Sequence, residues 1–283
     1  MIKPIQSDQA FLSDVVSQQA TDGHFRLWWL GQSGFLVQWQ SQHVLLDPYL
    51  SDSLTKKYAA TDKPHIRMTA RVVAPETLDF VDIVTSSHNH TDHLDAETLL
   101  ALRRANSGLV MVIPEANRSF VSDRMGCDPA WPIGLDDGKS TEVCGFTITG
   151  VPAAHEDLQT DGEGRHHFMG YVVRFGPWAV YHSGDTLLYP GMVERLRPFG
   201  VDLALLPING RNPARRVAGN LNGVQAARLA HDIGARMVIP CHYDMFTFNT
   251  DSPDAFIAEA ESLGQLFTIL QNGEGWHSSR LET

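Results

Sequence analysis

A cluster of potential metal ligands occupies residues 88 to 93. These residues read His-Asn-His-Thr-Asp-His and follow the apolar run from Val81 to Val84. Imidazole is the commonest protein ligand for borderline transition metals, and carboxylate is its usual partner. In an extended turn, His88 and His90 can point the same way while Asp92 and His93 curl round to a second point. The spacing therefore predicts metal binding, with room for two adjacent sites; the alternative is a polar loop that carries surface histidines.

Four other residues share one feature with this cluster, because each is a His or Asp that comes directly after an apolar, β-like run. They are Asp47, His155, Asp185 and His242. Ligands often converge where strands end and loops begin, so these residues are candidates to join the 88–93 cluster. Taken one at a time, each has an ordinary alternative as a turn residue, a helix cap or a strand-end hydrogen-bonding group.

Apolar periodicity predicts the elements that position these side chains. A short leading helix is expected at 9–19. The predicted strands cover 25–30, 35–39, 44–46, 81–85, 109–113, 142–151, 170–175, 178–182, 201–206 and 237–239. The predicted helices cover 96–104, 115–125, 224–233 and 254–262, with Asp95 and Asn222 as candidate N-caps. Residues 51–77 form the longest irregular stretch and are a candidate lid or substrate-facing loop.

This order of elements predicts an α/β fold. Strands come first and are followed by alternation of strands and helices, twice over, which suggests two β-rich layers pressed together with helices on the outer faces. No low-complexity linker divides the chain. We therefore predict a single domain over residues 1–283, with residues 1–24 as a helical extension packed on it.

Composition restricts the partners of the chain. Its 22 Lys and Arg against 33 Asp and Glu leave a net charge of −11, which argues against nucleic acid or an anionic membrane surface and favours a small-molecule substrate. The three cysteines form neither a disulfide framework nor a C-x-x-C zinc motif. The sequence shows no signal peptide and no run of about 18 apolar residues. We expect a cytoplasmic protein without membrane insertion, and a homo-oligomer stays open.

Jointly, the 88–93 cluster and the four strand-end residues resemble the metallo-β-lactamase superfamily, in order along nearly the whole chain. The resemblance implies a four-layer αββα sandwich with a two-metal centre on one edge. It implies that the first metal is bound by His88, His90 and His155, and the second by Asp92, His93 and His242. Asp185 would bridge both ions, and Asp47 would orient the ligands from behind.

Two branches of the superfamily resemble parts of the chain. Residues 28–34, 181–186 and 238–244 are similar to the ascorbate-6-phosphate lactonase branch, and residues 87–95 to the N-acylphosphatidylethanolamine phospholipase D type. The resemblance implies a hydrolase that uses a metal-bridging hydroxide to open a small ester. A lactone of a sugar or sugar-acid phosphate is favoured, with a phosphodiester as the alternative. The superfamily favours Zn²⁺, and the lactonase branch favours Mn²⁺.

Further residues are candidates for catalysis and substrate binding. Asp185 would offset the repulsion between the two ions. The leaving group needs a proton donor, for which the candidates by proximity in sequence are Asp92, His182 and Tyr243. The loop at 209–216 could clasp a substrate phosphate or carboxylate through Arg211, Arg215 and Arg216, although a solvated loop is the simpler reading. A metal-free binding module of the same fold is the alternative from another class, but all seven ligand positions are filled here.

Overall fold

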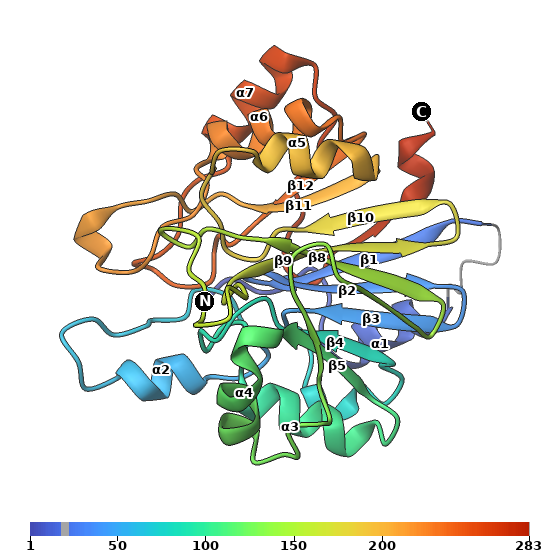
Figure 1. Ribbon diagram of the computed structural model, residues 1–283, viewed down its shortest axis with the longest axis vertical. Coiled ribbons are helices and arrows are strands. Elements are labelled where there is room, and N and C mark those ends of the chain that lie inside the picture. The colour runs from blue at the N-terminus through green and yellow to red at the C-terminus, as the bar shows by residue number, and fades with distance from the viewer. Residues whose placement is uncertain (18–22, 283) are drawn as a thin grey trace.

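Two β-sheets lie face to face, with helices on both outer surfaces (Figure 1). The computed structural model describes residues 1–17 and 23–282. Within these residues the first sheet has the strand order β13-β1-β2-β3-β4-β5-β6, and the second has the order β12-β11-β10-β9-β8-β7. Helices α1, α3 and α4 cover the first sheet, while α5, α6 and α7 cover the second. This arrangement is the predicted four-layer sandwich.

The elements have the following bounds. The first sheet contains β1 (Phe25–Gly31), β2 (Gly34–Trp39), β3 (Gln42–Leu46), β4 (Ile83–Thr85), β5 (Val110–Pro114), β6 (Ile133–Leu135) and β13 (Gly275–His277). The second contains β7 (Ser140–Val143), β8 (Phe146–Pro152), β9 (Met169–Phe175), β10 (Trp178–His182), β11 (Leu203–Pro207) and β12 (Met237–Cys241). The helices are α1 (Asp8–Ser17), α2 (Ser53–Tyr58), α3 (Ala96–Ala105), α4 (Arg118–Met125), α5 (Met192–Leu196), α6 (Gly223–Ile233) and α7 (Asp254–Leu263).

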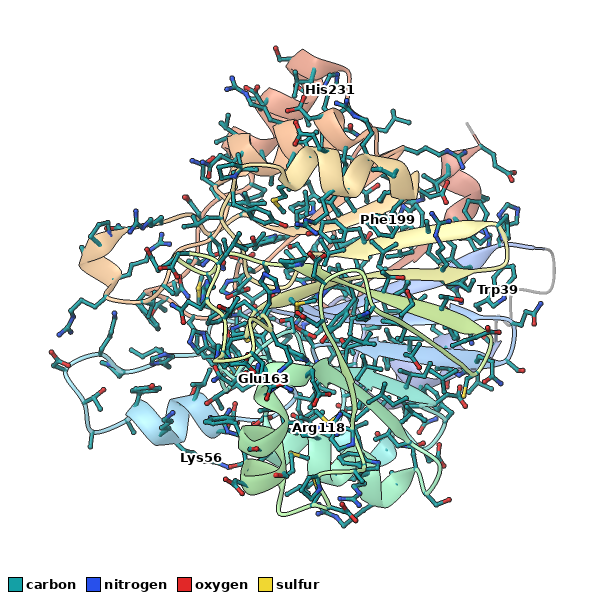
Figure 2. The ribbon with its side chains drawn as sticks, viewed as in Figure 1. Trp39, Lys56, Arg118, Glu163, Phe199 and His231 are labelled. Carbon is teal, nitrogen blue, oxygen red and sulfur yellow. The ribbon has the colours of Figure 1, made fainter. Side chains whose placement is uncertain are left out.

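Strand β1 shows how the layers are held together. Side chains alternate along a strand, so Leu27 and Trp29 enter the core between the sheets, while Trp28 faces the helices of the first sheet. Phe11 of α1 packs edge-on against Trp28, with 6.2 Å between the ring centroids. Because both faces are covered, every residue of β1 is buried, and apart from Arg26 and Gly31 the strand is apolar rather than alternating. At the end of the sandwich remote from the cavity loops, Trp39 packs against Phe175 (Figure 2).

Most predicted strands and long helices are confirmed, and the differences have local causes. The predicted strand 142–151 is a hairpin of β7 and β8, because Cys144 and Gly145 have φ of 49° and 75° and form a tight turn. Helix α2 forms inside the stretch 51–77 that was expected to be irregular. The helix predicted over 115–125 is α4, preceded by a 3₁₀ turn. Residues 18–19 of the predicted leading helix lie outside the described residues.

The topology brings five strand ends to one edge of the sandwich. Strand β3 is parallel to β4, and β10 is parallel to β11 and β12. Two antiparallel pairings through β9 make β8 parallel to β10 as well. The carboxyl ends of parallel strands meet at the same edge, which is where open α/β sheets place their ligands. No helix within the described residues is long and apolar enough to cross a membrane.

Candidate metal centre

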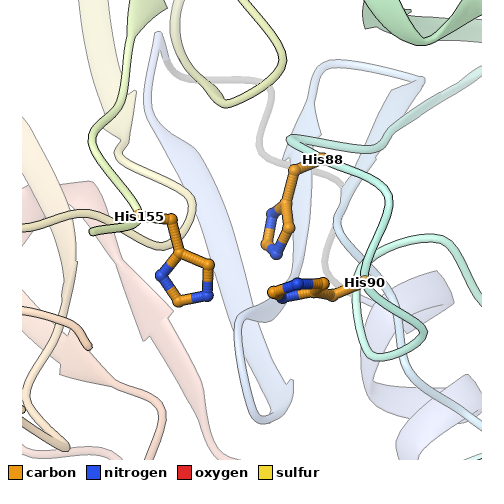
Figure 3. Close-up of side chains that lie close together, drawn as sticks. All are labelled: His88, His90 and His155. Carbon is orange, nitrogen blue, oxygen red and sulfur yellow. The ribbon is translucent and has the colours of Figure 1, made fainter. Parts of the chain in front are cut away.

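Three histidines converge after the ends of β4 and β8. His88 and His90 lie on the turn that follows β4, and His155 follows β8; their rings point toward one another in Figure 3. One nitrogen from each ring lies within 4.8 Å of the others. The ring centroids of His90 and His155 are 5.0 Å apart. This geometry leaves a space that three imidazole nitrogens surround.

Two further ligand groups lie beside the first, and one of them shares His88 with it. Asp92, His93 and His242 form one group, and His88, His93 and Asp185 form the other, each within the same 4.8 Å limit. Asp185 lies between the groups, with Oδ2 3.3 Å from Nε2 of His242 and 3.6 Å from Nε2 of His155. Its Oδ1 is 3.3 Å from Nε2 of His93. The structure therefore brings together all seven residues that the sequence analysis placed at the metals.

In three of the histidines, the ring nitrogen that lies away from the centre contacts a hydrogen-bonding group. This contact determines that the other nitrogen of the ring faces the centre. His93 donates from Nδ1 to Oδ2 of Asp47 at 2.8 Å, and His155 donates from Nδ1 to the Gly219 carbonyl at 2.9 Å. Nδ1 of His88 lies 3.0 Å from the Ser87 hydroxyl. Each ring thus turns Nε2 toward the others, as metal-binding histidines do when a second group orients them.

Several buried atoms at the centre have no hydrogen-bond partner among the described residues. They are Nε2 of His88, Nε2 of His93 and Oδ1 of Asp185. Buried polar atoms are normally paired, because leaving one unpaired costs about 1–3 kcal/mol. Imidazole nitrogens and a carboxylate oxygen are ligands that Zn²⁺ or Mn²⁺ accepts, so divalent cations at this centre would satisfy these atoms. The residues present therefore fit a metal.

Asp47 lies behind the candidate ligands and orients His93, in agreement with what the resemblance implied. It is fully buried and accepts hydrogen bonds from the Thr85 hydroxyl at 2.9 Å and the Ser87 amide at 3.0 Å, in addition to His93. Burial raises the pKa of this carboxyl, but the hydrogen bond from His93 and the charges of His182 and His93 outweigh burial and lower it. Asp47 therefore stays ionised and holds His93 in place.

Burial determines the protonation of the first ligand group. It lowers the pKa of His90 to about 4, with a further contribution from the charge on His155. Burial, reinforced by His93 and His90, also holds the pKa of His88 well below 6.5. Both imidazoles are neutral at pH 7, which is the form that coordinates a metal.

A cavity of about 360 Å³ opens above the centre. Its floor includes His90, Asp92, His155, Asp185 and His242. Its walls and rim include Leu54, Lys57, Tyr58, His65, Arg124, Arg216, Phe246 and Phe248. The segment 51–77 thus does face the cavity. Sequence reasoning missed Lys57, Tyr58, His65 and Arg124, because nothing in their spacing links them to the ligands.

Two of the candidate proton donors do not reach this cavity. His182 is buried and donates from Nε2 to the Ser33 carbonyl at 2.8 Å. The Tyr243 hydroxyl donates to the Leu270 carbonyl at 2.5 Å. Neither side chain lines the cavity, so the geometry does not support their expected role as acids. Asp92 does line it, with its side chain 16% exposed.

The three arginines of the 209–216 loop have different surroundings. Arg211 forms an ion pair with Glu156 at 2.5 Å, and Arg215 donates to the backbone carbonyls of Asn209 and Thr250. Of the three, Arg216 alone lines the cavity. The hypothesis that this loop clasps a substrate anion is therefore not supported for Arg211 and Arg215, whose guanidinium groups bind other groups of the protein.

Gln32 is a residue of the centre that sequence reasoning did not select. Its Nε2 donates to Oδ2 of Asp92 at 2.8 Å and lies 3.1 Å from Nε2 of His242. Its backbone carbonyl accepts from the His242 amide and from the Trp29 indole, both at 3.0 Å. Gln32 has a positive φ of 51° in the turn between β1 and β2. The turn indicated a hairpin rather than a site, and the similarity of residues 28–34 to the lactonase branch gave Gln32 no role.

Comparison with known proteins places this geometry in a family. The family described as a beta-lactamase superfamily domain matches residues 42–243, which include every ligand named above. The chain belongs to the metallo-β-lactamase superfamily. A UPF0173 metal-dependent hydrolase of Rubrobacter xylanophilus is 31% identical over 251 residues, 86% of this chain and 91% of that protein. One from Methanopyrus kandleri is 29% identical over 256 residues, 89% of this chain and 99% of that protein.

Solved structures of the superfamily share the fold. Igni18, a metallo hydrolase from Ignicoccus hospitalis, superposes with a TM-score of 0.65 at 23% identity, over 90% of this chain and 98% of that one. The metallo-β-lactamase fold protein YhfI from Bacillus subtilis does so with a TM-score of 0.64 at 19% identity, over 90% of this chain and 99% of that one. The predicted metallo-β-lactamase sandwich is confirmed.

A glycine beside the centre leads to a first prediction. Gly184 precedes Asp185 and has a φ of +58°, and a Cβ there would lie 2.6 Å from Cβ of Ser87 and 2.8 Å from the Met169 carbonyl oxygen. We expect Gly184→Ala to lower the free energy of unfolding by roughly 2–4 kcal/mol, since the left-handed backbone and the overpacking both oppose it. Urea denaturation measures this loss. Gly108→Ala, with nothing within 4 Å, is the control; equal losses in the two variants would contradict the prediction.

Proposed function

We propose that this protein is a binuclear metal-dependent hydrolase that opens a small ester, with a lactone of a sugar or sugar-acid phosphate as the favoured substrate. The observation that carries the proposal is the position of Asp185 between the two His-rich groups, with Oδ2 near both His155 and His242. Two divalent ions roughly 3.5–4 Å apart lower the pKa of a shared water toward about 7 and polarise the scissile carbonyl. Zn²⁺ is the favoured ion and Mn²⁺ the alternative.

The residues of the chain divide the work. His88, His90 and His155 would hold the first ion, and Asp92, His93 and His242 the second. Asp185 would bridge them and offset their mutual repulsion. Since His182 and Tyr243 are engaged in the core, we assign Asp92 to accept the proton that the attacking water gives up and to pass it to the leaving group. It would do so through Oδ1, the oxygen that Gln32 does not bind.

The size of the cavity supports a small substrate. A volume of about 360 Å³ lies at the lower end of the range of ligand pockets, roughly 300–1,000 Å³. A lactone on one or two rings fits such a space. A phosphodiester with two bulky substituents fits less well, which is why we place the lactone first.

The proposal is tested by metal content and by turnover. We expect protein purified without chelator to contain two divalent ions per chain by elemental analysis. It should hydrolyse members of a lactone panel faster than bis-p-nitrophenyl phosphate. Activity should disappear when a chelator removes the ions and return with Zn²⁺ or Mn²⁺. Hydrolysis that persists after complete metal removal would overturn the proposal, and faster turnover of the phosphodiester would replace the lactone with the alternative.

Gln32 gives a second prediction. Because its amide donates to Asp92 beside His242, we expect Gln32→Ala to weaken binding of the second Zn²⁺ about 10- to 100-fold and to leave the first unchanged. Gln32→Met, which has a similar length but no amide, should weaken it to a similar extent, since it also removes the donation to Asp92. Calorimetric titration of the metal-free protein against a competing chelator measures both affinities. Unchanged second-site affinity in both variants would refute the assignment.

A further inference from the structure

The mouth of the cavity carries charge of the opposite sign to the protein as a whole. The chain has a net charge of −11. Apart from the metal-centre carboxylates of Asp92 and Asp185, however, the charged residues that line the cavity are Lys57, Arg124 and Arg216. A cleft lined by charge of one sign concentrates ligands of the other sign. The mouth is therefore built to attract an anion in spite of the acidic surface.

Two of these cations are free to bind a ligand. Lys57 forms no ion pair with a carboxylate in the part of the chain that the structure describes; its ammonium lies 5.2 Å from the ring centroid of Tyr58. Arg216 pairs with Asp62 at 2.8 Å, but the side chains are 60% and 77% exposed. Exposed pairs contribute little, so a substrate anion can take the place of Asp62 at small cost. Arg124 instead donates to the carbonyls of Asn89 and Leu94 and supports the metal-binding turn.

An aromatic wall stands beside these cations. Tyr58 and His65 are stacked with ring centroids 4.1 Å apart and 17° between the planes. The rings of Phe246 and Phe248 form T-shaped contacts with the ring of His65, with 5.4 and 4.5 Å between the ring centroids. All four residues line the cavity. This group of rings gives the cavity an aromatic wall against which a planar ring can pack, edge-to-face or offset.

From this arrangement we propose that the substrate is an anionic ester on a flat ring, whose carboxylate or phosphate is bound by Lys57 and Arg216. This inference rests on the proposed hydrolase function and specifies its substrate class. The ring packs on the Tyr58–His65 wall, and the ester carbonyl reaches the centre formed by Asp92, Asp185 and the histidines. The basic rim gives the anion a place of its own, so the anion does not compete with the carbonyl for the metals.

The charge selectivity is tested with a matched pair of lactones, phthalide and 5-carboxyphthalide, which share a flat ring and differ by one carboxylate. We expect the full-length protein to show a kcat/KM about tenfold or more higher for the carboxylate. Lys57→Gln and Arg216→Gln should each lower kcat/KM for 5-carboxyphthalide about tenfold, through KM, and change kcat/KM for phthalide much less. The preference for the carboxylate should also decline as salt is added.

Three variants serve as controls. Lys56→Gln removes the neighbouring charge on α2, which pairs with Glu97 at 2.8 Å and does not line the cavity (Figure 2). Arg211→Gln removes the arginine that is paired with Glu156. Asp62→Asn breaks the ion pair with Arg216 but keeps the positive charge of Arg216. This variant should therefore retain or strengthen the preference for the anionic substrate. If Asp62→Asn and Arg216→Gln reduce the preference equally, loop closure rather than charge explains the effect and the inference is overturned.

A binding measurement separates this inference from the proposed function. Calorimetric titration of the protein as purified with isophthalate, a non-hydrolysable dianion on a flat ring, should give a Kd that rises about tenfold in Lys57→Gln and Arg216→Gln and is unchanged in Lys56→Gln. If both lactones are hydrolysed equally and neither variant changes this Kd, the substrate class is wrong although the hydrolase stands. If the Kd responds as expected but metal removal does not affect turnover, the proposed metal chemistry fails while the anion site stands.

Discussion

Asp185→Asn is expected to lower kcat/KM for the hydrolysed ester by roughly 10³-fold or more. The side chain is buried among the Nε2 atoms of His93, His155 and His242, at 3.3 to 3.6 Å. An amide has nearly the same shape but no charge, so it cannot offset the repulsion between two cations. We expect elemental analysis to show fewer than two ions per chain in this variant.

The fold of the Asp185→Asn variant should be largely retained, because the side chain lies on the floor of the cavity, at the edge of the sandwich, rather than in the hydrophobic core between the sheets. Circular dichroism and urea denaturation test this. Asp232→Asn, on the exposed face of α6, is the matched control and should keep both ions and full activity. Wild-type metal content together with wild-type activity in Asp185→Asn would contradict a bridging role for this carboxylate.

Asp47→Ala should cause the largest loss of stability among the residues around the centre. The carboxylate is fully buried and accepts from Thr85, Ser87 and His93. Its removal leaves these buried donors unpaired, and we expect a loss of about 3–5 kcal/mol in the free energy of unfolding. Metal affinity should fall about 10- to 100-fold as well, since His93 loses the group that orients it.

The contribution of Asp47 to the stability of the fold should decrease as the pH falls. The pKa of this carboxyl is lower in the folded protein than its usual 3.8, so its contribution to stability is present above pH 3.8 and is lost as the pH falls through the folded value. Urea denaturation of the wild type and of Asp47→Asn, which keeps the shape and one acceptor, should converge at low pH. If Asp47→Ala does not fold, Asp47→Asn carries the test, with a smaller loss at pH 7. An unfolding midpoint identical to that of the wild type in both variants would refute the stabilising role of the Asp47 carboxylate.

The candidate ligands could be found in the sequence because the 88–93 cluster and the strand-end His and Asp residues follow apolar runs typical of buried strands, and because together they resemble the superfamily pattern. His88, His155 and His242 come from three separate strands, yet each lies just past a strand's carboxyl end. Parallel strands bring those ends to one edge, so the run of apolar residues predicts the position of the polar one. The order of elements likewise predicted the sandwich, because strands buried on both faces need helices outside them.

Short elements were not predicted, because their own residues carry too little hydrophobic pattern. Strands β6 and β13 contain three residues each, too few for a hydrophobic period, and they form because β5 and β1 offer an unpaired edge. Helix α2 has only six residues and packs through Leu54 against the aromatic cluster near the cavity. Elements of this size depend on their neighbours more than on their own composition.

By itself, the sequence determined the fold class and marked the 88–93 cluster and the strand-end His and Asp residues as candidate ligands, since those features follow from residue type and from the period of buried strands. The assignment of seven candidate ligands, with Asp47 as their support, came from the resemblance to the superfamily. Only the tertiary structure decided which other side chains meet them. It turned Arg211 toward Glu156 and Arg216 toward the cavity, although both lie on one loop. It also placed Gln32 against Asp92 and Lys57 at the mouth. The direction of a loop side chain depends on contacts with distant parts of the chain, and no local spacing encodes those contacts.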